Sequence, residues 1–413
     1  MRSRVSQLGW MVAVAALAAW LGGGCAGPAT RGETYFRAEK APPMGPQGVR
    51  QPGERPRFEQ KELEGRGLEE LWAFYLGEPV RGLWIFDEWL IVATAPGSVW
   101  GVELETGFVR WKYELPDGLS YPPGSYAYRD EGLSRAPELY LISRDVLHVV
   151  DRNVGALLWK YRLPFAAASP PVGSDSHIYI GSWDDRLYAI SKSLRYVEWS
   201  YRTGAPVTAP VAVAERTVDA IYVGSEDGNL YAMNPVADER KWAFPTRGRI
   251  VAAPTYHRTF VYVVSQDMNV YCIEGARDVL RWRYASGSPL SQKPIGFGRE
   301  TLAVVADDGR LLCLNLRPEV RKENLRWSAE GIVRVIAKTR RAIVALRRDG
   351  KLMAFDEETG EERWRPLVTG ADVHGTNEYD PSSPLKAEQK MASIIPLGYK
   401  DGWLVALREK RDF

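Results

Sequence analysis

Side chains suited to acid–base or metal chemistry are few in this chain of 413 residues, which has 4 histidines. The histidines are widely separated, and no pair has the i, i+4 spacing of a helical metal site: His148, His177, His257 and His374. Carboxylates gather near the last of them, in segment 366–393, at Asp372, Glu378 and Asp380. No known ligand spacing matches this group, so a solvated or partner-facing loop explains it better than a metal site.

Nucleophilic catalysis has no recognisable arrangement either. A Ser–His–acid triad can occur in any chain order, but the Gly-x-Ser-x-Gly turn of α/β-hydrolases is absent. Two runs, GSWDD at residues 181–185 and GSEDG at residues 224–228, look like phosphate-binding loops. Both lie between expected strands and no helix follows them, so we interpret them as hairpin turns. The sequence therefore predicts no catalytic, metal-binding or cofactor-binding residue, and no enzyme.

The rest of the chain repeats one unit, best seen at residues 219–244 (DAIYVGSEDGNLYAMNPVADERKWAF). Residues 221–224 have the branched and aromatic side chains of a β-strand, and residues 230–233 form the returning strand. Asp227 and Gly228 predict a two-residue type I′ turn, because Gly adopts positive φ freely and Asp tolerates it. A further strand ends on Trp242.

Strand–turn–strand units of this kind recur along the chain, at residues 90–104, 139–151, 178–191, 221–234, 261–274, 302–315, 342–356 and 394–408. A tryptophan closes a matching number of segments: Trp72, Trp111, Trp159, Trp199, Trp242, Trp282, Trp327 and Trp364. The period of about 42 residues is enough for four short strands and their turns. We predict an all-β fold, an eight-bladed β-propeller with four-stranded blades.

The phase of the repeat predicts how the ring closes. Trp72 precedes the first unit, whereas no tryptophan follows the last unit. The N-terminal strand at residues 70–76 should therefore complete the C-terminal blade, which removes two free sheet edges. The repeated tryptophans could form a sugar-binding or quinone-stacking surface, but a residue that every blade requires is better explained by packing between blades.

The N-terminus predicts export. Arg2 and Arg4 precede an apolar run at residues 8–21, which is short for a membrane-spanning helix. Three glycines and Cys25 follow, as in the signal sequences of bacterial lipoproteins, where the cysteine is lipidated; a plain secretory signal and an uncleaved anchor are the alternatives. Cys272 and Cys313 occupy equivalent places in successive repeats, so we expect buried free thiols and no disulfide.

Composition divides the chain into three regions. We predict a lipoprotein-type signal peptide at residues 1–25, a disordered tether rich in proline and glycine at residues 26–66, and the propeller at residues 67–413. The net charge of +2 and the absence of a basic tract argue against nucleic-acid binding.

Two connections are longer than hairpin turns, at residues 116–138 and 366–393. The first contains Tyr121, Tyr126 and Tyr128 among prolines. Tyrosine is enriched at protein interfaces, so these three residues are the candidate partner-contact loop.

The repeated I-Y-V-G-S-x-D-G-x-L-Y-A-x-N, followed by W-x-Y or W-x-F, resembles the tryptophan-docking blade of the pyrroloquinoline-quinone-like propellers over nearly all of residues 70–408. One branch, the quinoprotein alcohol dehydrogenases, has adjacent cysteines, a catalytic aspartate and calcium ligands. This chain has no adjacent cysteines, and none of those site residues can be matched. The other branch, the BamB-like lipoproteins, resembles it in length, blade number and signal, although blades two, six and seven depart from the repeat.

The second resemblance implies a non-catalytic scaffold, anchored by lipid on the periplasmic face of the outer membrane. Such a scaffold docks on the barrel-forming subunit of the assembly machinery and assists the insertion of outer-membrane β-barrel proteins. Ala26 after Cys25 resembles the sorting pattern for outer-membrane delivery. A cell-envelope propeller with another protein partner, or a quinone-dependent oxidoreductase, are the alternatives.

Overall fold

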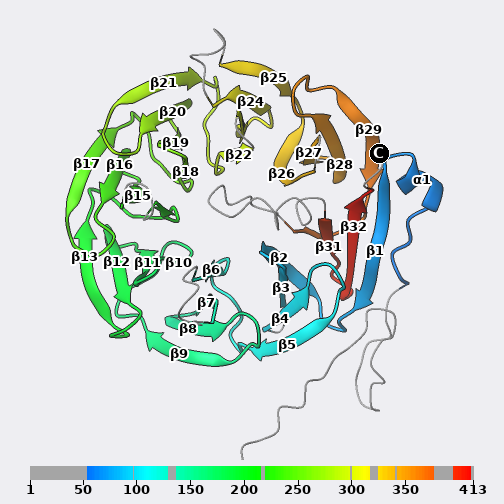
Figure 1. Cartoon of the computed structure of the whole chain (residues 1–413), viewed down its shortest axis with the longest axis horizontal. Helices are drawn as coiled ribbons and strands as arrows, with labels where there is room; N and C mark the ends of the chain where they lie inside the picture. The colour runs from blue at the N-terminus through cyan, green and yellow to red at the C-terminus, as the bar shows by residue number, and fades with distance from the viewer. Residues whose placement is uncertain are drawn as a thin grey trace, which may run out of the picture. The chain divides into compact units, whose positions relative to one another are not determined.

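The computed structural model describes residues 54–95, 97–128, 136–214, 219–297, 300–316, 324–339, 342–375 and 394–410. In these ranges the chain forms one short helix, α1 (Gln60–Glu64), and 32 strands arranged in antiparallel sheets of four (Figure 1). Each sheet is one blade of a propeller, and in blades 1 to 7 the strands follow one another from the centre of the ring to its rim. The predicted eight-bladed fold is confirmed.

The strands of the first four blades have these bounds. Blade 1 contains β2 (Val80–Phe86), β3 (Trp89–Thr94), β4 (Ser98–Glu103) and β5 (Val109–Glu114). Blade 2 contains β6 (Gly124–Tyr126), β7 (Glu138–Ser143), β8 (Val146–Asp151) and β9 (Leu157–Arg162). Blade 3 contains β10 (Val172–Gly173), β11 (His177–Gly181), β12 (Arg186–Ser191) and β13 (Val197–Arg202). Blade 4 contains β14 (Ala212–Val213), β15 (Ile221–Gly224), β16 (Asn229–Met233) and β17 (Arg240–Pro245).

The remaining blades follow the same order. Blade 5 contains β18 (Thr255–His257), β19 (Phe260–Ser265), β20 (Asn269–Glu274) and β21 (Leu280–Ala285). Blade 6 contains β22 (Ile295–Phe297), β23 (Thr301–Val305), β24 (Leu311–Asn315) and β25 (Leu325–Ala329). Blade 7 contains β26 (Ile332–Lys338), β27 (Ala342–Arg347), β28 (Lys351–Asp356) and β29 (Glu362–Val368). Blade 8 contains β30 (Val373–His374), β31 (Ile394–Gly398), β32 (Trp403–Glu409) and β1 (Leu68–Tyr75).

Blade 8 closes the ring with strands from both ends of the chain. Its rim strand β1 pairs antiparallel with β32, with Glu69 opposite Arg408 and Ala73 opposite Val405. The two strands lie side by side in Figure 1, one blue and one red. This pairing confirms the predicted closure by the N-terminal strand.

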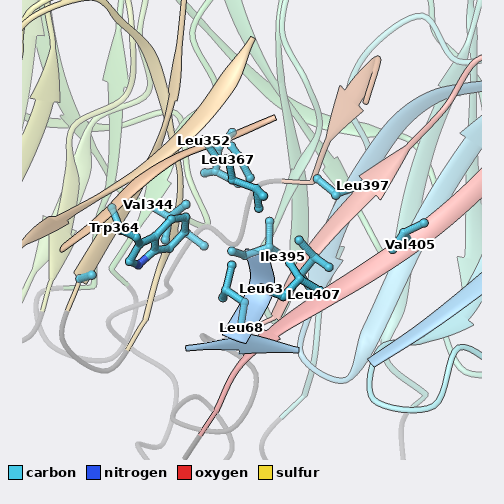
Figure 2. Packing of buried hydrophobic residues seen from close by; sticks show 14 of the residues in the cluster. Leu63, Leu68, Val344, Leu352, Trp364, Leu367, Ile395, Leu397, Val405 and Leu407 are labelled. Carbon is cyan, nitrogen blue, oxygen red and sulfur yellow. The ribbon is translucent and has the colours of Figure 1, made fainter. Parts of the chain in front are cut away.

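The hydrophobic core is divided into clusters, and each cluster combines side chains from two consecutive blades. Figure 2 shows the cluster between blades 7 and 8, where Trp364 and Leu352 lie near Ile395 and Leu407. Leu63 of α1 also belongs to this cluster and is 4% exposed. Because every blade buries one face against each neighbour, no blade has a complete core of its own.

Ordered structure begins before residue 67, where the predicted tether was expected to end. The helix α1 precedes β1, and Arg66 after it donates to the backbone carbonyls of Arg365 at 2.8 Å and Pro366 at 3.0 Å. The signal peptide with Cys25, and the tether up to residue 53, lie outside the described residues.

The eight expected strand–turn–strand units are the second and third strands of the blades, as predicted. The turn geometry differs from the prediction of type I′. Gly228 has φ +85°, but Asp227 does not have positive φ. The Gly228 N–H donates to the Ser225 carbonyl at 3.1 Å, and the Asp227 carboxylate accepts the Asn229 N–H at 2.8 Å. The loop between β15 and β16 therefore has four residues, 225–228, where a type I′ hairpin has two, and it needs only one left-handed position.

One tryptophan lies in each rim strand, and these are the eight tryptophans of the sequence repeat. Seven of them are at most 9% exposed, and Trp242 is half-buried. Five indole N–H groups donate, at 2.8 to 3.4 Å, to a backbone carbonyl of the next blade: Trp72 to Leu104, Trp111 to Arg152, Trp242 to Gly275, Trp282 to Leu316 and Trp327 to Glu357. Each ring thus joins its blade to the following one.

Candidate partner-docking sector

Exposed apolar side chains are concentrated in two adjacent blades. Twelve large hydrophobic side chains are exposed in the part of the chain that the structure describes, and six of them belong to blades 2 and 3: Val154, Leu157, Leu158, Trp183, Leu194 and Tyr196. An even distribution over eight blades would give these two blades three. We call blades 2 and 3 with these six residues the docking sector, because these two adjacent blades carry half of the exposed large apolar side chains.

Trp183 is the most unusual residue of the docking sector. It lies in the turn between β11 and β12 and is 56% exposed, whereas the repeat tryptophan of the same blade, Trp199, is 8% exposed. In the other blades with a turn of this length, no residue at the corresponding position is large and apolar: Ala95, Glu226, Gln266, Asp307, Arg348 and Lys400. The fold therefore does not require an indole here, and exposed tryptophan is the side chain most enriched at binding hot spots.

Hydrogen bonds and a ring stack support the turn that carries Trp183. The backbone N–H of Trp183 donates to the Ala166 carbonyl at 3.2 Å. Below the turn, the rings of Phe165 and Tyr188 stack with centroids 3.8 Å apart and planes within 1°. The Tyr188 hydroxyl donates to the Asp184 carboxylate at 2.6 Å. Burial, together with Asp184, raises the pKa of Tyr188 to about 12, so the hydroxyl remains a donor at neutral pH.

The other exposed residues of the sector lie on the other face of the ring from Trp183, since successive turns of an antiparallel sheet alternate between its two ends. Val154 and Leu157 adjoin the turn between β8 and β9, and Leu194 and Tyr196 lie in the turn between β12 and β13. The corresponding positions in blade 7 are acidic or polar, Thr359, Glu361 and Glu362, whereas blade 5 has the exposed apolar residues Val279 and Leu280 at two of them. Exposed apolar residues at this turn are therefore shared with blade 5, whereas the exposed indole of Trp183 occurs in blade 3 alone among the described turns of this kind.

The predicted contact tyrosines lie in the same sector, and their hydroxyl groups bond to blade 3 or to the chain before it. Tyr121 donates to the Ala167 carbonyl at 2.5 Å, and Tyr126 to the Asp175 carboxylate at 2.5 Å. Tyr128 accepts a hydrogen bond from the Lys192 ammonium at 3.1 Å. All three are half-buried. The structure shows them holding blade 2 to blade 3, and their contact with a partner stays a prediction.

The histidines are not brought together. They lie in four different blades, and His177, His257 and His374 are buried. Ring nitrogens of three histidines form hydrogen bonds to three different groups. His148 bonds to the Tyr113 hydroxyl at 2.9 Å, His177 to the Glu198 carboxylate at 3.0 Å and His374 to the Thr369 hydroxyl at 3.2 Å. Within the described ranges, no three His, Cys, Asp or Glu side chains are placed to hold a metal ion. Nor does any helix in those ranges have the length and apolarity to cross a membrane.

The second long connection is described only at its start. Asp372 forms an ion pair with Lys400, with 3.0 Å between carboxylate and ammonium, so this carboxylate is used to join β30 to the turn before β32. Glu378 and Asp380 lie outside the described residues. Cys272 and Cys313 are buried thiols, and burial raises the pKa of Cys313 to about 12, which leaves it protonated and unreactive.

Comparisons with known proteins agree with this fold. The BamB structure from Moraxella catarrhalis superposes with a TM-score of 0.62 and 14% identity, over 83% of this chain and 99% of that one. The computationally designed Ika8 protein gives a TM-score of 0.58 and 14% identity, over 80% of this chain and 96% of that one. At such identities the likeness shows the fold alone. No curated protein matches the chain by sequence.

A family model, by contrast, matches the sequence itself. The model described as "Outer membrane protein assembly factor BamB" matches residues 143–365, from the second strand of blade 2 into the rim strand of blade 7. This match covers more than half of the 413 residues. The chain therefore belongs to the PQQ-like propeller family described as outer membrane protein assembly factor BamB.

Proposed function

We propose that this protein is a non-catalytic scaffold of the cell envelope that assists the assembly of outer-membrane β-barrel proteins by binding a protein partner at the docking sector. The observation that carries the proposal is Trp183, an exposed indole at a turn position where no other blade has a large apolar side chain. The family description supports the assembly role. The partner we propose is the barrel-forming subunit of the assembly machinery.

The proposal includes attachment to a membrane. A positive start, an apolar run and Cys25 after three glycines support lipidation at Cys25, and Ala26 supports delivery to the outer membrane. The tether from residue 26 to residue 53 is long enough for a mean reach of about 30 Å if it behaves as a flexible coil. The propeller would then work in the periplasm close to the membrane surface.

Co-precipitation from detergent-solubilised envelopes tests the docking role. We expect Trp183→Ala to weaken recovery of the barrel-forming subunit by at least about tenfold, because loss of a central indole removes a hot spot. The matched control is Val368→Ala, which truncates another exposed apolar residue, 60% exposed, in blade 7. Recovery that Trp183→Ala leaves unchanged would contradict docking at this site.

Two other results would change the proposed function. Recovery of a different envelope protein in a Trp183-dependent manner would indicate a binding module with another partner. Alcohol oxidation by the protein supplied with pyrroloquinoline quinone and Ca²⁺, measured with a redox dye, would indicate an oxidoreductase of the same fold.

Fractionation tests the anchor. We expect Cys25→Ala to move the protein from the membrane fraction to the soluble periplasmic fraction, because the diacyl group supplies the membrane affinity. Cys272→Ala, which alters a buried thiol, is the control and should stay with the membrane. Membrane association that persists in Cys25→Ala would show that another part of the chain makes the attachment.

A further inference from the structure

Two buried cations occupy equivalent positions in blades 2 and 3. Arg152 and Lys192 each begin the turn between the third and fourth strands, and their side chains are 5% and 6% exposed. The other blades in which one turn joins these strands have no cation at this position: Leu104, Pro235, Gly275, Leu316 and Glu357. A buried charge is costly unless it is paired and hydrogen-bonded, so the surroundings of these two residues are informative.

Arg152 joins blades 1 and 2. Its guanidinium forms an ion pair with Asp87 at 2.6 Å and donates to the Ser125 hydroxyl at 2.8 Å. Ser125 belongs to β6, the innermost strand of blade 2. One side of this short strand is thus held by a buried cation of its own blade.

Lys192 holds the same strand from blade 3. Its ammonium lies 2.8 Å from the Glu138 carboxylate. Three aromatic rings surround it, with centroids at 4.3 Å for Tyr126, 4.7 Å for Tyr128 and 5.4 Å for Tyr140. All are within the distance at which a ring face attracts a cation. We call these three tyrosines and Glu138 the tyrosine cage.

The cage has its own hydrogen bonds. The Tyr140 hydroxyl donates to the Glu138 carboxylate at 2.7 Å, and the rings of Tyr126 and Tyr128 meet edge to face at 5.3 Å. Burial and the Glu138 charge hold the pKa of Tyr140 well above its usual value, so the hydroxyl stays a donor. These contacts are formed within blade 2, without any atom of Lys192. The residues of the cage thus all come from blade 2, and the cation that fills it comes from the next blade.

We propose that the tyrosine cage is a binding site for small alkylammonium groups and that Lys192 is its built-in ligand, which holds the inner strand of blade 2 against blade 3. Aromatic faces around one carboxylate are the chemistry that recognises organic cations. The proposal concerns the isolated chain and does not depend on the docking function.

Chemical rescue of Lys192→Ala tests the site. The substitution removes three carbons and the ammonium group, and propylammonium replaces those same atoms. We expect Lys192→Ala to lower the thermal midpoint and to speed amide hydrogen exchange in β6. Propylammonium at 100 mM should restore slow exchange and raise the midpoint of this variant by about 2 °C, because a ligand that binds only the folded state stabilises it.

Three controls make the outcome decisive. Arg195→Ala removes an exposed cation from the same turn and should not respond to propylammonium. The wild-type protein should not respond either, because Lys192 fills the cage. Propan-1-ol, which lacks the charge, should not rescue Lys192→Ala. An equal response of all three proteins, or no response of Lys192→Ala, would overturn the proposal.

A second pair of variants covers the case in which Lys192→Ala folds poorly. Lys192→Met keeps the apolar stem but leaves the Glu138 carboxylate buried without its cation, which is strongly unfavourable. Adding Glu138→Gln removes that charge, so the double variant should melt at a higher temperature than Lys192→Met. A double variant no more stable than Lys192→Met would contradict the charge pairing on which the site depends.

Discussion

At the scale of single residues, the repeat tryptophans determine which glycines the neighbouring blades must have. Gly155 has φ +69°, and a Cβ at this position would lie 2.7 Å from the Trp111 ring. Gly107 and Gly360 meet Trp72 and Trp327 in the same way. The indole packs directly on a backbone that has no side chain, which brings its N–H within reach of the carbonyl of the next blade. The period of the repeat predicted that these tryptophans pack between blades, but nothing in the sequence predicted the contact between each indole and a glycine of the next blade.

Substitution of Gly155 by alanine tests this close packing, and Gly118 provides a matched control. Gly118 also has φ +69°, but a Cβ there would meet nothing within 4 Å. We expect Gly118→Ala to cost about 1 kcal/mol through backbone strain alone. Gly155→Ala should cost about 1 to 3 kcal/mol more, because the new methyl group displaces Trp111. Urea denaturation of both variants measures the difference, and equal costs would show that the indole can move without penalty.

Residue comparison between blades is also what reveals Trp183. The sequence GSWDD was correctly interpreted as a hairpin turn, and that interpretation left the exposed indole without a role. The signal becomes visible only when the turns are aligned blade by blade, because no other blade has a large apolar side chain at this position. Lys192 and its cage could not be found from the sequence, since Glu138 and Lys192 come from different blades and meet only after folding.

At the scale of elements, the second and third strands were predictable and the innermost strands were not. Strands such as β15 are fully buried and rich in branched residues, which gives a clear signal. The innermost strands of blades 3, 4 and 8 have only 2 residues each, too few for any alternation to show. The turn prediction was wrong at Asp227 because the dipeptide Asp-Gly does not reveal how many residues the loop contains.

A buried histidine in the short strand β30 makes the stability of the folded protein depend on pH. His374 is 4% exposed, and burial, with Arg334 nearby, lowers its pKa to about 4; Asp372 acts in the opposite direction. In the unfolded chain the imidazole binds a proton below about pH 6.5, whereas in the folded chain it stays neutral to about pH 4. The unfolded state therefore binds more protons in this window, and stability falls as the pH falls.

We expect this histidine to cost the protein about 2 kcal/mol between pH 7.5 and pH 5. His374→Asn, which keeps a polar group near Thr369 but cannot titrate, should lose correspondingly less stability over this range. Carboxylates with lowered pKa, such as Glu78, act below about pH 4.5 and do not confuse the comparison. Urea denaturation at the two pH values is the measurement, and parallel losses in both proteins would refute the assignment to His374.

At the scale of the whole molecule, stability depends on the seam in blade 8. Each interface between blades is a shared core, so an open seam would expose the clusters on both sides of blade 8. The helix α1 strengthens the seam by placing Leu63 in the cluster with blade 7, as Figure 2 shows. The order of tryptophans along the chain predicted the seam. It did not predict α1, because five residues rich in charge carry no helical pattern on their own.

A disulfide across the seam tests this dependence. Glu69 and Arg408 are direct partners in the β1–β32 pair and also form an ion pair at 2.6 Å. Opposite residues of antiparallel strands are close enough for a disulfide. We expect Glu69→Cys with Arg408→Cys, in a chain whose Cys25 is alanine, to oxidise readily. Cys272 and Cys313 should not interfere, because they are 1% and 0% exposed.

The new bond joins residues 339 positions apart, so it removes a large part of the freedom of the unfolded chain. We expect the oxidised protein to gain about 2 to 5 kcal/mol over its reduced form. Urea denaturation with and without reductant measures the gain, and the single variant Glu69→Cys controls for loss of the ion pair. If the oxidised and reduced forms unfold at the same urea concentration, the seam is not where the ring opens, and unfolding must begin between two other blades.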